Sequence, residues 1–166
     1  MTNFRIAGLP AAQFEHLHQL SNTALAKINA QRCVVEEKPG YPCRVSLIDA
    51  EIGETVYLLP YCHQPDSSPY QAVGPIFVRA NAVTTQLQEN EIPLMLRHRT
   101  LSLRGYDSGD MMIETRIANG EKLEMVLDEL FQCAAVDYVH IHNAGPGCFN
   151  CRVDRVVVQP SGNRRL

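Results

Sequence analysis

The fold is decided by residues 99–117, RTLSLRGYDSGDMMIETRI, which predict a β-hairpin. Apolar and polar residues alternate on both sides of residues 107–110, where Gly109 can adopt the positive φ that a tight connection needs. The next segment, Glu121 to Phe131, carries leucine, valine and phenylalanine on one helical stripe, with Asn119 as a candidate cap. A hairpin followed by an amphipathic helix is typical of an α+β fold in which the helix covers one face of the sheet.

Short runs of strand-forming residues lie on both sides of this unit, separated by glycine, proline and polar turns. Two short helices are expected near the N-terminus, one of them at Thr23 to Ile28 with Ser21 or Asn22 as cap, and the proline-rich stretch Gln64 to Pro75 should be a loop. Further strands are expected at Phe4 to Ile6, Cys33 to Val35, Cys43 to Ile48, Thr55 to Leu59 and Ile76 to Val78, and a second hairpin joins Val136 to His142 with Arg152 to Val158.

These elements predict one domain over residues 1–166, of class α+β. We expect a mainly antiparallel, twisted sheet of about six to eight strands. The helix at Glu121 to Phe131 and the short N-terminal helices should pack on it. The order of the strands does not follow from the sequence.

Composition predicts a soluble, cytoplasmic protein. The chain is 45% hydrophobic and 20% charged with a formal net charge of -3, so no partnership with nucleic acid or with a membrane surface is expected. No run approaches the roughly 20 apolar residues that span a bilayer, and no export signal is apparent at the N-terminus. The six cysteines are therefore expected to be reduced. The oligomeric state is not predicted.

The segment from His140 to Arg155 concentrates chemically active groups. Side chains alternate across a strand, so His140 and His142 should share one face. The following turn and strand add an amide, two thiols, two guanidinium groups and a carboxylate, from Asn143, Cys148, Cys151, Arg152, Arg155 and Asp154.

One interpretation of these groups is an anion site. Arginines make up 12 of the 15 basic residues, and their forked donors suit phosphate and carboxylate groups. Arg44, Arg104 and Arg152 would gather around such a ligand together with the two histidines. His140 or His142 would then serve as general acid or base, because imidazole titrates near neutral pH.

Two other interpretations stay open. A metal-binding protein would use the His140-x-His142 pair, with a third ligand from Cys148, Cys151 or a neighbouring strand. A non-catalytic interaction module would pair its arginines with carboxylates and hold its histidines by hydrogen bonds within the sheet. Cys62-His63 precedes the proline-rich loop, where it could reach a site, but it is interpreted as incidental.

Three motifs occur in order along the chain: Gly40-Tyr41-Pro42-Cys43-Arg44, then Pro69-Tyr70 with Gly74 to Arg79, then His140-x-His142-Asn143-Ala144 with Pro146-Gly147-Cys148. Together they resemble an uncharacterised bacterial family known as domain of unknown function 1203, over most of the chain. The resemblance implies no activity and no cofactor. It implies only where a site should lie, at Cys43, Arg44, Arg79, His140, His142, Asn143 and Cys148.

The leading prediction is a small-molecule enzyme or binding protein for an anionic ligand, with the enzyme question left open. The catalytic candidates are His140, His142 and Cys148; the ligand-binding candidates are Arg44, Arg79, Arg152, Asn143 and Cys43; no residue is assigned as a metal ligand, and no cofactor is named. This prediction requires residues distant in the sequence to converge on one cleft that solvent can reach.

Overall fold

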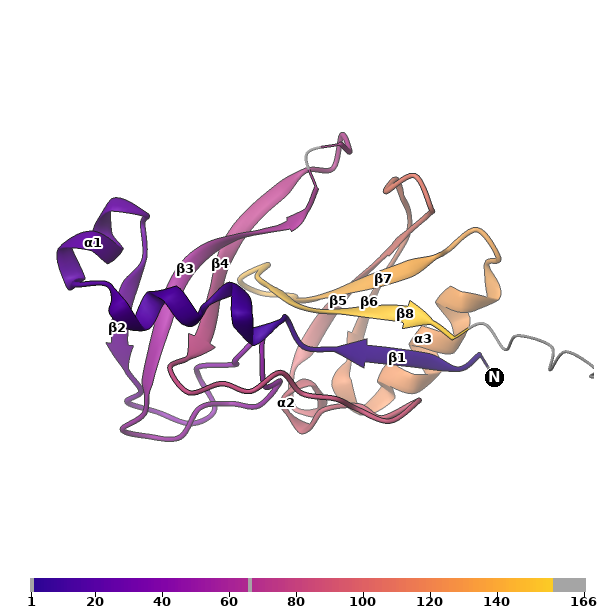
Figure 1. Cartoon of the computed structure of the whole chain (residues 1–166). Coiled ribbons are helices and arrows are strands. Elements are labelled where there is room, and N and C mark those ends of the chain that lie inside the picture. The colour runs from indigo at the N-terminus through magenta and orange to yellow at the C-terminus, as the bar shows by residue number, and fades with distance from the viewer. Residues whose placement is uncertain (1, 66, 157–166) are drawn as a thin grey trace, which may run out of the picture.

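The computed structural model describes residues 2–65 and 67–156, and within these it has eight strands in two sheets with a few short helices. The strands pair antiparallel throughout. The α+β class predicted from the sequence is therefore confirmed, but the strands divide between two sheets where one was expected. Figure 1 shows the two sheets side by side. The turn between β7 (Tyr138–Asn143) and β8 (Phe149–Arg155) points toward β3 (Thr55–Gln64) and β4 (Ala72–Arg79).

The larger sheet has five strands in the order β1-β8-β7-β5-β6. Both expected hairpins are present in it, since β5 pairs with β6 and β7 pairs with β8. The last strand begins earlier than expected, and the final two residues of its expected range, 157 and 158, lie outside the described residues. The bounds are β1 Phe4–Ala7, β5 Thr100–Tyr106, β6 Met112–Asn119, β7 Tyr138–Asn143 and β8 Phe149–Arg155.

One face of the five-stranded sheet is covered by α3 (Leu123–Gln132). A short 3-10 turn, η3 (Gly120–Lys122), leads into this helix, and the Asn119 side chain accepts a hydrogen bond from the main-chain N of Glu121. Apolar side chains of the helix meet those of the sheet in one core, which includes Leu123, Leu127, Leu130, Phe131, Leu101, Leu103, Val139, Ile141, Cys151 and Val153. Because side chains alternate along a strand, the residues between these sheet positions point to the opposite face.

The smaller sheet has the order β2-β3-β4, with β2 at Gln31–Val34, β3 at Thr55–Gln64 and β4 at Ala72–Arg79. Phe14, Leu17 and Leu25 of the N-terminal helical segments join a core with this sheet. Ser21 caps α1, as expected, by accepting a hydrogen bond from the main-chain N of Ala24 at 3.1 Å. The N-terminal helical segments are η1 Ala11–Gln13, η2 Glu15–Gln19 and α1 Asn22–Lys27. A further short helix, α2 Leu94–Arg97, lies between β4 and β5 in the sequence.

Two expectations about strands were wrong. Residues 43–48 form a turn with isolated bridges, in which the main-chain N of Leu47 donates to the carbonyl of Cys43 and Leu47 has φ +52°. Packing overrides strand propensity here, because Val45 and Leu47 are buried in the two cores. Strand β3 also continues past Pro60 to Gln64, and β4 begins at Ala72, so part of the expected loop is paired strand.

The continuation of β3 is compatible with its proline. Pro60 lies opposite Pro75 of β4, beyond the residues that pair with β2. Neither proline can donate a main-chain hydrogen bond, so the two suit a position of the ladder where no donor is needed. The extra residues bring the end of β3 over the five-stranded sheet.

Two further properties of the fold concern membrane-spanning helices and the state of the cysteines. Among residues 2–65 and 67–156, no helix has the length and apolar character needed to cross a bilayer. All six cysteines are free thiols.

Candidate functional site

Three histidines meet where the two sheets face each other. His140 and His142 lie on the face of β7 turned away from α3, and His63 reaches them from the end of β3. The ring centroid of His63 lies 5.9 Å from that of His140 and 4.9 Å from that of His142. The His140 and His142 rings are 6.2 Å apart. The two imidazoles predicted to share a face are thus joined by a third from the other sheet.

The ring nitrogens of this His63–His140–His142 cluster converge. One nitrogen from each residue lies within 4.8 Å of those from the other two. Each ring also has a buried nitrogen that makes no hydrogen bond within the described protein: Nδ1 of His63, Nδ1 of His140 and Nε2 of His142. Buried polar atoms are nearly always hydrogen-bonded, so three such atoms on neighbouring rings are unusual.

The tautomer of His142 follows from its one hydrogen bond. Its Nδ1 lies 2.9 Å from the carbonyl oxygen of Gly147, an acceptor, so Nδ1 carries the proton and donates it. Nε2, which is buried and has no hydrogen-bond partner among the described residues, then has a free lone pair. Gly147 has φ +78°, a left-handed conformation that glycine adopts without cost and that shapes the turn bearing this carbonyl. Such a partner on the far nitrogen is typical of histidines that bind metals.

Electrostatics keep all three imidazoles uncharged. Burial lowers the pKa of His142 to about 4, and the positive charge of Arg104 acts in the same direction. Burial likewise lowers the pKa of His63 to about 4 and that of His140 to about 2, with Arg104 again a contributor in both cases. Near neutral pH the cluster therefore offers lone pairs rather than positive charge.

Aromatic rings enclose the cluster. The Phe149 ring stacks on that of His63, with centroids 5.2 Å apart and an interplanar angle of 1°. Tyr106 and Tyr138 stack on each other at 5.1 Å, and each lies within 5.2 Å of the His140 ring. These rings contribute to the burial of His140 and His142, which are 3% and 0% exposed, whereas His63 is partly exposed.

A hydrogen-bonded chain holds the end of β3 in place above the five-stranded sheet. Nε2 of Gln64 donates to the hydroxyl of Tyr138 at 2.9 Å, and this hydroxyl donates to Oδ1 of Asp110 at 2.5 Å. Gln64 directly follows His63, so these hydrogen bonds fix the position of His63 relative to His140 and His142. Burial and the Asp110 carboxylate both raise the pKa of Tyr138.

Of the arginines predicted to bind a ligand, Arg44 is buried beside the cluster, with 2% of its surface exposed. Its Nε donates to the carbonyl of Phe149 at 2.7 Å and its Nη1 to the carbonyl of Pro42. Burial lowers its pKa to about 10. Both hydrogen bonds support main chain, so this guanidinium holds the turn around Phe149.

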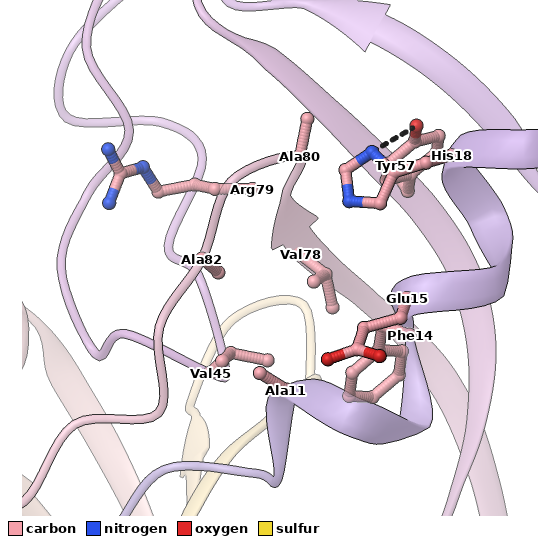
Figure 2. Close-up of a pocket in the computed structure, with 10 residues that line it drawn as sticks. All are labelled: Ala11, Phe14, Glu15, His18, Val45, Tyr57, Val78, Arg79, Ala80 and Ala82. Atoms are coloured by element: carbon pink, nitrogen blue, oxygen red, sulfur yellow. Dashed lines mark hydrogen bonds between the residues drawn. The ribbon is translucent and has the colours of Figure 1, made fainter.

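Arg79 lies apart from the histidines, at the end of β4. Its guanidinium makes a forked ion pair with Glu54, with Nε–Oε distances of 3.0 and 3.1 Å, and its main-chain N donates to the buried thiol of Cys43. Figure 2 shows Arg79 at the rim of a small pocket with Phe14, Glu15 and His18, its guanidinium extending away from them. Nδ1 of His18 in the same pocket is 3.4 Å from the hydroxyl of Tyr57.

The remaining predicted residues lie around the β7–β8 turn. Arg152 is exposed, pairs with Asp154 at 2.7 Å and places its guanidinium 3.6 Å from the centre of the Tyr138 ring. The Asn143 side chain accepts a hydrogen bond from Asn150 at 2.7 Å. The thiol of Cys148 is partly exposed. The structure therefore brings His140 and His142 together, with Arg152, Asn143, Cys148 and Arg44 nearby, and leaves Arg79 and Cys43 apart.

His63 was not among the predicted site residues. The signal for it was present, because Tyr57, Leu59, Tyr61 and His63 alternate like a strand. Pro60 in that run made the strand appear to stop at Leu59. Only the pairing of Pro60 with Pro75 in the folded chain shows that it continues.

Comparisons with known proteins add one finding. The model of a family described as "Protein of unknown function (DUF1203)" matches residues 40–155, a span that contains all three histidines. No curated protein and no solved structure matches the chain.

Proposed function

The chain belongs to this family of unknown function, and we propose that it binds a divalent transition metal ion, in the simplest case zinc, through His63, His140 and His142. Three imidazoles leave one position of a tetrahedral ion for water or another small ligand. That arrangement is typical of metal sites that carry out chemistry, whereas purely structural sites have four protein ligands.

The observation that supports this proposal is the convergence of one ring nitrogen from each of the three histidines. Each of these rings also has a buried nitrogen without a hydrogen-bond partner among the described residues. If the histidines served only to fill the sheet, each buried nitrogen would be expected to have a hydrogen-bond partner. If they served as acid or base groups, their pKa values would be expected near neutral pH, whereas burial lowers all three far below it. Neutral imidazole is the form that binds a metal.

The geometry is close to that of an occupied site. Zinc–nitrogen bonds of about 2.0–2.1 Å place two ligand nitrogens of a tetrahedral site roughly 3.3–3.4 Å apart. The nitrogens of the cluster lie within 4.8 Å of one another, so side-chain movements of at most about 1.5 Å would close it. Imidazole ligands suit zinc, iron, copper and nickel, so the ligand set restricts the metal to this class.

An anion site built from Arg44, Arg79 and Arg152 has less support. Each of these guanidinium groups already has protein partners: main-chain carbonyls for Arg44, Glu54 for Arg79 and Asp154 for Arg152. Their charges are thus satisfied within the fold.

The proposal is tested by measuring the metal content of purified protein and the thermal shift of chelator-treated protein on adding zinc or cobalt(II). At a free metal concentration of about 100 times Kd, binding stabilises the fold by roughly 2.7 kcal/mol. For a chain of this length the expected rise in Tm is roughly 5–10 °C. His63→Gln, His140→Gln and His142→Gln should each abolish the shift.

His16→Gln is the matched control, because His16 is exposed and distant in sequence from the cluster. It should bind metal like the wild type. A wild-type protein that is purified without stoichiometric metal and shows no shift with any of these ions would refute the proposal.

A further inference from the structure

We propose that the ligand at the open position of this metal is a small anion, a carboxylate or phosphate group, held at its other end by Arg104. This inference rests on the metal site proposed above and adds the class of molecule that the site takes. It is carried by the position of Arg104, by its lack of an acidic partner and by the balance of charge around the cluster.

Arg104 occupies the position on β5 directly opposite His140 on β7. Directly opposed residues of antiparallel strands point to the same face, with Cβ atoms about 4.5–5.5 Å apart. The side chain is half-buried, and a side-chain hydrogen bond links it to Tyr106, whose ring lies 5.1 Å from that of His140. Its guanidinium therefore lies on the histidine-bearing face, close to the cluster.

Arg104 differs from the other arginines in the described ranges. Four of them pair with a glutamate: Arg5, Arg79, Arg97 and Arg116. Arg99 and Arg152 pair with aspartates. Arg44 and Arg155 donate to main-chain carbonyls. Arg32 donates to Asn22 and to the carbonyl of Leu20. Within residues 2–65 and 67–156, Arg104 has no carboxylate or carbonyl acceptor. A half-buried guanidinium without one is suited to an external anion.

The charges around the cluster point the same way. The charged side chains that act on the three imidazoles are Arg104, Arg152 and Arg44, all positive. Arg152 is neutralised by Asp154, which leaves Arg104 and the buried Arg44. A dication held by three neutral imidazoles would add two further positive charges. An anion bound between the metal and Arg104 supplies the missing negative charge.

The test uses cobalt(II)-loaded protein, because the visible absorption of cobalt reports changes at its open position. Acetate and inorganic phosphate are titrated in turn, and at least one of them should change the spectrum saturably. Arg104→Gln should retain one cobalt per chain but bind that anion at least tenfold more weakly. Arg104→Lys, which keeps the charge without the fork, should give an intermediate loss and serves if Arg104→Gln does not fold.

Arg116→Gln is the matched control, since Arg116 is exposed on β6 and paired with Glu114. It should bind the anion like the wild type. Failure to bind cobalt would overturn the metal site itself. Normal cobalt binding with no response to either anion, or with equal affinity in wild type and Arg104→Gln, would overturn this inference and leave the metal site standing.

Discussion

Metal-free protein should lose stability between neutral and mildly acidic pH because of its buried histidines. The pKa of His142 is about 4 in the fold, against an ordinary value of 6.5, and burial is the main cause. The unfolded chain therefore binds a proton more readily than the folded chain does, so protons favour unfolding. The stability contributed by the neutral ring is complete above about pH 6.5 and is lost as the pH falls toward about 4.

The size of this effect follows from the two pKa values. Proton linkage at His142 alone removes about 2 kcal/mol of unfolding free energy between pH ~7 and pH ~5. His63 and His140 have lowered pKa values too, so their contributions have the same sign. With a urea slope of roughly 2 kcal/mol per molar, the His142 term shifts the midpoint by about 1 M.

The assay is urea unfolding in the presence of a chelator at the two pH values, for wild type, His142→Gln and His16→Gln. The carboxylates of Glu54 and Glu124 have pKa values lowered by arginine partners, so they stay ionised across this window and do not produce the loss. His142→Gln should lose much of the pH dependence, and His16→Gln should keep it. Equal stability at both pH values, or an undiminished loss in His142→Gln, would refute the reasoning.

Two other substitutions test the supports of the site. Arg44→Met should lower the free energy of unfolding by about 3 kcal/mol or more in denaturant titrations, because two charge-assisted hydrogen bonds of roughly 1.5–3 kcal/mol each are lost; a more stable variant would contradict the role assigned to Arg44. Tyr138→Phe should cost about 1–2 kcal/mol, since it leaves Gln64 and Asp110 without their shared partner; unchanged stability, together with unchanged metal affinity, would show that this chain of bonds does not hold His63.

Much of the fold was predictable because its signals are local. Alternation and a short glycine-containing turn predicted the β5–β6 hairpin, and a single apolar stripe predicted the helix that became α3. Ser21 was recognised as a cap from its type and position. The division into two sheets was not predictable, since it depends on which strands pair over long sequence distances.

The site was predictable only where its residues are close together in the sequence. His140 and His142 are two residues apart, so strand geometry alone places them on one face. His63 is 77 residues before His140, and it joins them only because β3 continues beyond Pro60 and Gln64 binds Tyr138. The sequence prediction gave Arg79 a ligand-binding role and did not list Arg104 among the site residues. The sequence cannot show that Arg79 is paired with Glu54 or that Arg104 has no acidic partner in the described chain.

The three histidines come from both sheets, and this has a mechanical consequence. A metal ion bound to them would act as a cross-link between β3 of one sheet and β7 of the other, where the His63 ring stacks on Phe149 and Gln64 donates to Tyr138. Occupancy would then set how freely the two halves of the molecule move against each other. Amide exchange at the ends of β3 and β4 should slow when metal is added, while exchange in α3 stays the same.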